Sequence, residues 1–170
     1  MRDVSMLPNA PVLRPARADE QPALQEIRRL AFAPIFASFR SLLGDELYAL
    51  VQAREDAAQG DLLASLLAPD SAWEVHVVEV SDVVVGFVSI HLNPETRNGE
   101  VGLNAVHPEH AGRGIGTAMY EFALARMREA GMQAATVSTG GDSSHAPARR
   151  AYEKAGFTAQ VPSVWLCRTL

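Results

Sequence analysis

The sequence contains a single cysteine, few aromatic residues and no long apolar run. With Cys167 as its only cysteine, the chain cannot form an internal disulfide, which is typical of proteins from reducing compartments. Its longest strongly apolar run, 83–90, is far shorter than the roughly 18 residues that a membrane-spanning helix needs. Residues 1–13 also lack the apolar core of a secretion signal. We therefore expect a cytoplasmic protein with no membrane partner.

Positive charge is also in short supply. The chain has 15 Lys and Arg residues against 20 Asp and Glu residues, for a formal net charge of −5. A protein of this sign is poorly suited to nucleic-acid phosphates or anionic lipid headgroups. We expect no nucleic-acid partner, and a cationic small molecule is the easier ligand.

The remaining composition is that of an ordinary globular chain. Hydrophobic residues make up 48% and charged residues 21% of the 170 positions. This length is enough to bury a core without disulfides or metal, and it matches the size of one domain. We expect one domain over 1–170, without repeats or linkers.

Apolar periodicity predicts helices in the first third of the chain and strands after it. Asp19 can cap a first helix that Pro34 ends. The predicted strands are 12–17, 73–80, 83–92, 100–106, 134–139, 157–161 and 163–170; the helical segments are 19–33, 35–59, 61–67, 112–130 and 147–156. This order predicts one mixed α/β sheet with helices on its faces.

A glycine-rich turn at 107–117 carries the most information about chemistry. Gly112, Gly114 and Gly116 occupy alternate positions between a predicted strand and an amphipathic helix. Without Cβ atoms on one edge, successive backbone N–H groups can approach a bulky anion, and the helix dipole adds positive potential. Arg113 can add a charge-assisted contact. The pattern favours a diphosphate site.

Three other interpretations of the glycines differ from a diphosphate site. They could serve only to turn the chain tightly. A dinucleotide fingerprint would follow its strand at once and have glycine where Thr117 stands, whereas here the strand ends several residues earlier. A P-loop would end in G-K-[ST], and the chain has no such tripeptide.

Two motifs together resemble the GNAT superfamily of N-acetyltransferases. The acetyl-CoA motif [Q/R]-x-x-G-x-[G/A] corresponds to 111–116, with Ala111 in place of the usual first residue, and follows a strand ending Val106-His107-Pro108. The signature N-x-x-A-x-x-x-Y-x-x-x-G-F corresponds to 145–157, with His145 in place of asparagine. Two motifs in this order, each at a predicted strand-to-helix junction, are far more specific than either alone.

The resemblance implies a fold and a cosubstrate. The implied fold is α/β (α+β): a central, mostly antiparallel sheet of about six to seven strands, splayed in the middle, with helices on both faces. Residues 73–160 would form the acetyl-CoA-binding core and 20–68 a helical acceptor-side region. The implied acetyl-CoA-binding residues are Asn104, Ala105, Val106, Ala111, Gly112, Arg113, Gly114, Ile115, Gly116, Thr117, His145 and Ala148.

Acetyl transfer to an amine needs a base and an acid. An ammonium group has no lone pair and must lose a proton before it attacks, and the leaving thiolate usually gains one. Tyr152 occupies the position that protonates the CoA sulfur in the family the chain resembles. A phenol is a proton donor at neutral pH. The bland alternative is a tyrosine packed on its helix.

Glu100 is the expected base. Strand alternation would place Glu100, Gly102, Asn104 and Val106 on one face of 100–106, so the carboxylate would share a face with a small and a polar residue. The segment 99–106 also resembles the histone acetyltransferase branch, whose base glutamate stands at the same distance before the cofactor motif. The alternatives are a solvated glutamate or deprotonation through ordered water.

The acceptor side is less distinctive. Phe32, Phe36 and Phe39 lie within eight residues and could wall an amine pocket or simply pack in the core. Asp142 and His145, beside the expected reaction centre, could contact the amine or only cap a turn and a helix. Pro108 forbids the helix that a paired-histidine zinc site at His107 and His110 would need, so no metal is expected.

The resulting hypothesis is an acetyl-CoA-dependent N-acetyltransferase that moves the acetyl group directly to a primary amine of a small molecule or peptide. The chief alternative is a non-catalytic acyl-CoA-binding or regulatory module, and a nucleotide-binding α/β domain is a second. The sequence does not name the acceptor amine, and it leaves a homodimer open.

Overall fold

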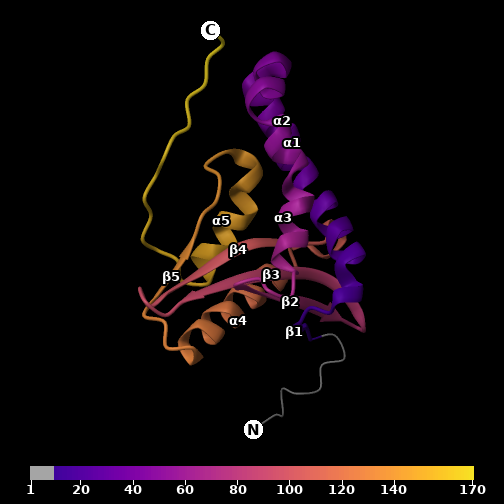
Figure 1. Ribbon diagram of the computed structural model, residues 1–170, viewed down its shortest axis with the longest axis vertical. Helices are drawn as coiled ribbons and strands as arrows, with labels where there is room; N and C mark the ends of the chain where they lie inside the picture. The colour runs from indigo at the N-terminus through magenta and orange to yellow at the C-terminus, as the bar shows by residue number, and fades with distance from the viewer. Residues whose placement is uncertain (1–9) are drawn as a thin grey trace.

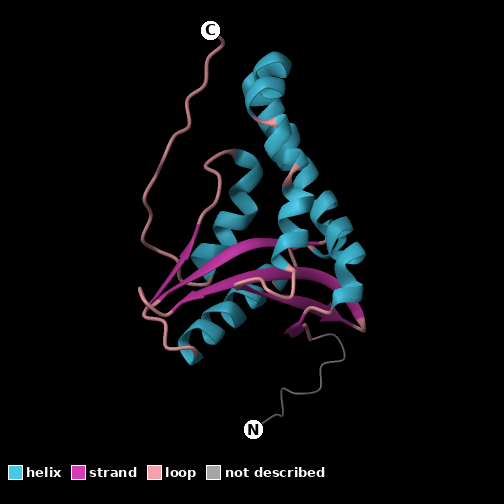
Figure 2. Cartoon of the chain, in the orientation of Figure 1, coloured by secondary structure: helices cyan, strands magenta, loops and turns pink. Residues whose placement is uncertain are grey.

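A five-stranded sheet forms the centre of the computed structural model, which describes residues 10–170 (Figure 2). Its strands, in spatial as well as chain order, are β1 (Val12–Pro15), β2 (Trp73–Val80), β3 (Val83–Asn93), β4 (Asn98–Val106) and β5 (Ala134–Val137). Neighbouring strands are antiparallel except β4 and β5, which are parallel. Residues 1–9, part of the segment 1–13 in which no secretion signal is expected, lie outside the described residues.

The predicted strands 73–80 and 83–92 form the β2–β3 hairpin. Ser81 and Asp82 both have positive φ, 51° and 63°, as two-residue hairpin turns require. The strands on either side are rich in valine, whose branched side chain packs well on a pleated sheet.

Helices cover both faces of the sheet (Figure 1). They are α1 (Gln21–Val51), α2 (Ala53–Ala57), α3 (Gln59–Leu66), α4 (Ile115–Glu129) and α5 (Ala146–Lys154), with short 3-10 turns η2 (Ala18–Glu20), η3 (Pro108–His110) and η4 (Ser143–His145). On one face Met119 and Met127 of α4 pack on Ile90 and Val101. On the other, Leu24 of α1 joins a separate buried cluster with α3 and β3. The site lies at one end of this layered core.

The prediction that Pro34 ends the first helix is wrong. Pro34 lies inside α1, and the break in helical geometry comes at Gly44, where φ is 75° and ψ is 159°. Phe32 and Phe36 lie on either side of the proline. Their rings are in edge-to-face contact with centroids 6.0 Å apart, as residues one helical turn apart can be. Glycine reaches positive φ without steric cost, so the kink forms there.

The two expected C-terminal strands are absent, so the sheet has five strands rather than six to seven. Residues 157–170 form no regular structure, and in Figure 1 the yellow trace runs away from the sheet. The side chains of Val161, Val164 and Leu166 are exposed. Strand propensity is realised only when side chains pack on neighbours; here Phe157 packs against the core, but the large apolar side chains from Val161 onward do not.

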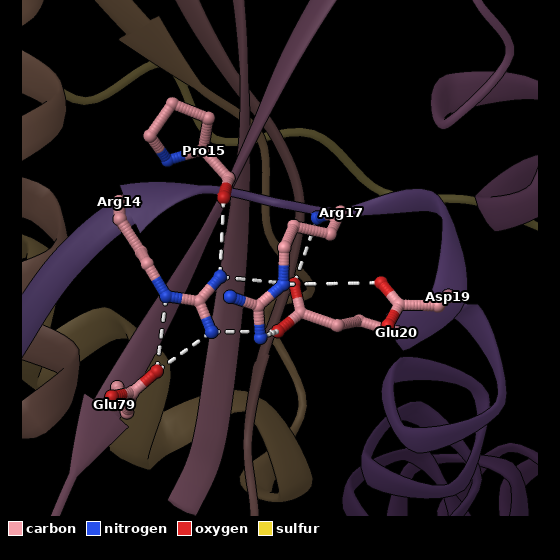
Figure 3. Close-up of polar contacts among 6 residues, drawn as sticks. All are labelled: Arg14, Pro15, Arg17, Asp19, Glu20 and Glu79. Carbon is pink, nitrogen blue, oxygen red and sulfur yellow. Dashed lines mark hydrogen bonds and ion pairs between the residues drawn. The ribbon is translucent and has the colours of Figure 1, made fainter. Parts of the chain in front are cut away.

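An ion network holds the start of the chain to the sheet (Figure 3). Arg14 on β1 donates to both oxygens of Glu20, at 2.6 and 3.0 Å, and to Glu79 on β2 at 2.6 Å. The Arg14 hydrogen bond is the main cause that lowers the pKa of Glu20 to about 2, outweighing the opposing effect of burial. This network fixes the point where α1 leaves the sheet.

Candidate active site

The site begins where β4 and β5 separate. Pairing runs from Asn98 with Ala134 to Val101 with Val137 and stops there, although β4 continues to Val106. The second half of β4 therefore has no strand neighbour on its β5 side. Its N–H and C=O groups on that edge are open to an extended ligand, as the sequence resemblance implies.

The turn before α4 is built around left-handed glycines. Gly112 and Gly114 have φ of 73° and 80°, and a Cβ added at either would meet nothing within 4 Å. Gly116 is different because it lies in the first turn of α4, where a Cβ would make ordinary contact with Ala151 and Tyr120 at 3.8 and 3.9 Å. Two of the three glycines are thus required by backbone conformation.

This glycine turn, residues 111–114, presents unused donors. Within the described chain the backbone N–H groups of Gly112, Arg113 and Gly114 donate to no other group. They precede the N-terminus of a 15-residue helix, whose dipole favours negative charge at that end. Arg113 is exposed and forms no ion pair with residues 10–170. Open donors, a helix end and a free guanidinium fit a diphosphate.

A cavity of about 330 Å³ lies beside the open half of β4. Aromatic side chains of α1 wall one side, and the far side is formed by β4, the chain after β5, and α5. The lining residues are Phe32, Ile35, Phe36, Phe39, Gln52, Asp56, Gln59, Gly102, Leu103, Asn104, Ser138, Thr139, His145, Ala148 and Tyr152. The three phenylalanines expected on the acceptor side are therefore brought together here.

Tyr152 presents its hydroxyl at this cavity from α5. The residue is 6% exposed, and its hydroxyl oxygen accepts a hydrogen bond from Asn104 Nδ2 at 3.2 Å. Asn104 Oδ1 accepts in turn from the Tyr120 hydroxyl at 2.8 Å, and the two tyrosine rings lie 4.4 Å apart. Burial raises the pKa of Tyr120, which stays a donor. The Tyr152 hydroxyl accepts from Asn104 and can still donate its own proton to another acceptor.

The predicted alternation of β4 is wrong. Val88 pairs with Asn104 and Ile90 with Val101, so an extra residue of β4 bulges opposite Ser89. A bulge reverses the alternation on either side of it. Val101 therefore shares the α4 face with Asn104, whereas Glu100 points to the opposite face.

Glu100 itself is exposed and does not line the cavity. It pairs across the sheet with His91 of β3 on one side and Thr136 of β5 on the other. Its expected role as a base rests on the sequence alone.

The turn before α5 is built from side chains. Asp142 accepts hydrogen bonds from Ser38 Oγ of α1 at 2.7 Å, from the Ser144 backbone N–H at 3.1 Å, and from the Ser144 hydroxyl. His145 Nδ1 lies 2.5 Å from the other Asp142 oxygen. Arg149 of α5 donates to the carbonyls of Gly140 and Asp142. Burial raises the pKa of Asp142, but the hydrogen bonds from Ser144, Ser38 and His145 together lower it below its ordinary value.

The cavity lining contains an acidic residue but no lysine or arginine. This acidic residue is Asp56. The carboxylate is buried and accepts from the Tyr48 hydroxyl at 2.6 Å and from Gln52 Nε2 at 2.7 Å. Aromatic walls with one carboxylate are suited to an organic cation.

The expected cofactor residues fall into two groups. Ala111, Gly112, Arg113, Gly114, Ile115, Gly116 and Thr117 lie in the glycine turn and the first turn of α4, beside Ala105 and Val106 at the end of β4. Asn104, His145 and Ala148 instead line the cavity with the phenylalanines. Sequence reasoning did not single out Ser38, Asp56 or Tyr120 as site residues. Tyr120 alone had a signal, because it lies one helical turn after Gly116.

Other sites are less promising. A cavity of about 370 Å³ between α4, β5 and residues 155–159 contains none of the expected site residues. Residues 10–170 include no group of three or more His, Cys, Asp or Glu side chains placed to hold a metal ion. No helix in the described part of the chain has the length and apolarity to span a membrane.

Comparisons with known proteins agree with this geometry. A profile of the Acetyltransferase (GNAT) family matches residues 36–157. The structure resembles PaiA N-acetyltransferase from Thermoplasma acidophilum in complex with coenzyme A, with a TM-score of 0.70 and 17% identity over 91% of this chain and 93% of that one. It also resembles the ribosomal-protein-S18-alanine N-acetyltransferase from Escherichia coli, with a TM-score of 0.65 and 14% identity over 89% and 80%.

A third structure carries the cosubstrate. It is a GNAT family acetyltransferase from Brucella melitensis in complex with acetyl-CoA, with a TM-score of 0.61 and 20% identity over 88% of this chain and 84% of that one. At these identities the likeness is one of fold. No curated protein matches the sequence.

Proposed function

Because the chain belongs to the Acetyltransferase (GNAT) family, whose cosubstrate is acetyl-CoA, we propose that it transfers the acetyl group directly to a primary amine of a small molecule or peptide. The observation that carries the proposal is one juxtaposition. A buried tyrosine, whose hydroxyl accepts from Asn104, lines a cavity beside an open strand edge, and the glycine turn follows the end of that strand.

The glycine turn and the open half of β4 would bind the cosubstrate. Backbone N–H groups at 112–114 would accept the diphosphate, with Arg113 in reach of a phosphate. The unpaired main chain of 104–106 would pair with the amides of the extended arm, as a strand pairs with an added strand. Ala111 offers no side-chain hydrogen bond, so binding would depend chiefly on main-chain groups.

Tyr152 would supply the proton that the departing sulfur needs. Its hydroxyl oxygen accepts from Asn104, so the phenolic hydrogen can be donated to a group bound in the cavity. A module that only binds acyl-CoA has no need of a proton donor there. Glu100 and ordered water are the base candidates that the sequence provides.

The cavity supports a cationic acceptor. Asp56 can attract an ammonium group, and Phe32, Phe36 and Phe39 can contact its carbon chain or its charge. The net charge of −5 favours the same class of ligand. We propose that the chain forms a single domain. We also propose that the protein is cytoplasmic, because its only cysteine is consistent with a reducing compartment.

Free-thiol release from acetyl-CoA across a panel of amines tests the proposal. The panel should include polyamines, aminoglycosides, free amino acids and peptides with free N-termini, and calorimetry should measure CoA binding in parallel. We expect thiol release with at least one cationic amine. Tight CoA binding without release for any amine would favour a non-catalytic module, and absence of CoA binding would overturn both assignments.

A further inference from the structure

The histidine that departs from the family signature lines the cavity and belongs to a network of hydrogen bonds with Asp142, Ser144 and Ser38. His145 has a side chain 15% exposed, and Asp142, its partner at 2.5 Å, is 12% exposed. Asp142 is held from its own turn by Ser144 and from α1 by Ser38, a residue 104 positions away in the chain. The ring of His145 also lies against Phe39, with centroids 5.8 Å apart. Both α1 and the turn therefore fix the imidazole.

This network determines which ring nitrogen is free. An ionised carboxylate only accepts hydrogen bonds, so Nδ1 of His145 must carry the hydrogen that Asp142 receives. In a neutral imidazole Nε2 then has the lone pair. Nε2 bonds to no other described group, and the residue lines the same cavity as Tyr152. A proton acceptor and a proton donor thus face one space.

The carboxylates of Glu100 and Asp56 are less well placed than His145 to accept a proton from the amine. Glu100 is exposed and lies outside the cavity lining. Asp56 lines the cavity, but Tyr48 and Gln52 already donate to its two oxygens. Neither has an orienting partner comparable to the aspartate behind His145.

We propose that His145, oriented by Asp142 and Ser38, is the base that deprotonates the acceptor ammonium; this inference rests on the proposed acetyl transfer. Nε2 takes one proton from the ammonium, and Asp142 stabilises the imidazolium that forms. The amine lone pair then makes the C–N bond to the acetyl carbon as the C–S bond breaks.

The remaining protons balance as follows. The sulfur leaves with the proton of Tyr152, and the second nitrogen proton, lost as the amide forms, restores the tyrosine. His145 returns its proton to solvent. Acetyl-CoA and an ammonium thus yield an amide, a free thiol and one released proton.

The charged and titratable groups around His145 come from three elements. Asp142 of its own turn accepts a hydrogen bond from the imidazole. On α5, Arg149 is engaged by the carbonyls of Gly140 and Asp142, and Tyr152 faces the cavity. Asp56 of α2 lines the same cavity, and α1 contributes the uncharged Ser38 and Phe39. Histidine changes charge within the pH range in which such enzymes are assayed, so the profile can report it.

The kinetic test is the pH dependence of kcat/KM with the best amine of the panel. We expect His145→Asn, which restores the residue of the family signature, to lower kcat/KM about 100-fold at neutral pH and to abolish the acidic limb attributable to the imidazole. CoA affinity should change less than about threefold, because asparagine is the residue of the family signature at this position and the glycine turn is untouched. Ser38→Ala should lower kcat and shift the acidic limb of the pH profile, as expected of a residue that positions the base.

Two comparison variants separate the candidates. His91→Asn removes a histidine of β3 that does not line the cavity, and its profile should match the wild type. Glu100→Gln should keep the acidic limb. If instead Glu100→Gln loses the limb and His145→Asn retains both limb and turnover, the assignment of His145 is overturned in favour of Glu100.

A spectroscopic measurement on the free full-length protein needs no activity. Nitrogen-15 NMR of the imidazole should show His145 with its hydrogen on Nδ1, and Asp142→Asn should change that tautomer or its titration. A wild-type spectrum with the hydrogen on Nε2 would refute the proposal even if the variants fail to fold. Thiol release absent for every amine, with the expected tautomer present, would refute the proposed function instead.

Discussion

Two turns that join strands to helices meet at the site, and they are built in opposite ways. The glycine turn before α4 relies on left-handed backbone at Gly112 and Gly114 and leaves its N–H groups open. The turn before α5 relies on side chains, with Asp142 at the centre of hydrogen bonds from three residues. The first can bind a constant group, the diphosphate, whatever side chains surround it. The second can hold a particular side chain in one orientation.

This difference explains which substitutions each turn tolerates. Ala111 replaces a polar residue of the family motif in the glycine turn, where the main chain provides the donors. In the second turn His145 replaces asparagine, and a network that spans α1 and the turn surrounds it. We therefore expect a change of side chain at a non-glycine position to have little effect in the first turn and a large effect in the second.

The largest effect is expected where the second turn leads into α5. Tyr152→Phe should lower turnover about 100-fold by removing the proton donor, while CoA affinity stays within about twofold. Steady-state kinetics and calorimetry measure the two quantities. Unchanged turnover would contradict the acid role.

Tyr120→Phe is the matched control. Its hydroxyl donates to Asn104 Oδ1 at 2.8 Å, but the residue does not line the cavity. Loss of this buried hydrogen bond should cost about 1–2 kcal/mol of stability, with turnover reduced less than about tenfold. Equal kinetic effects for both tyrosines would mean that the network as a whole, rather than one hydroxyl, matters.

The glycine turn provides the second prediction. Gly114→Val should weaken CoA binding about 30-fold, because a side chain at φ of 80° is strained by about 1–2 kcal/mol and stands over the open N–H groups. Gly116→Ala, at an ordinary helical position, should change the dissociation constant less than about threefold. Equal losses at both positions would argue that bulk rather than backbone conformation governs binding.

The same contrast shows what the sequence could predict. The glycine turn and the tyrosine were predictable, since missing Cβ atoms and motif spacing are local properties of the chain. The contact between Ser38 and Asp142 was not, because it joins residues 104 positions apart and depends on how α1 lies over the sheet. The face of Glu100 was mispredicted because a bulge opposite Ser89 leaves no mark in the alternation of residues.

The helices and the chain end show a similar limit. Pro34 is a local signal for a helix end, but packing on both sides of it carries α1 onward to Gly44. Residues 157–170 have strand-forming composition without a strand to pair with. In each case the outcome depends on tertiary contacts that outweigh local propensity.

Low pH should weaken the stabilisation that comes from carboxylate networks, and it should leave main-chain turns unaffected. The pKa of Glu20 is lowered to about 2 from 4.5, so its contribution to stability is complete above about pH 4.5 and is lost as pH falls toward 2. For this carboxylate, 8% exposed, the contribution is at most about 3 kcal/mol. Urea unfolding between pH 6 and pH 2.5 should show a steeper loss for the wild type than for Glu20→Gln. The lowered pKa of Asp142 acts in the same direction. Parallel curves would contradict this account.

The smallest effect is expected at the chain end, which neither turn contacts. Deletion of 161–170 should change the free energy of unfolding by less than about 0.5 kcal/mol and leave CoA affinity unaltered, since its large apolar side chains are exposed. Thermal unfolding and calorimetry measure both. A clear loss of stability would reveal that these residues bury surface in solution.

The chain has two tryptophans, and they report on different regions. Trp73 begins β2, stacks near His91 at 5.2 Å and lies under Gly102, where an added Cβ would be 2.3 Å from its ring. Trp165, 62% exposed, lies in the C-terminal segment. Acrylamide should therefore quench the red-shifted emission of Trp165 first, so that the shielded emission of Trp73 can follow events beneath the cavity without any added label.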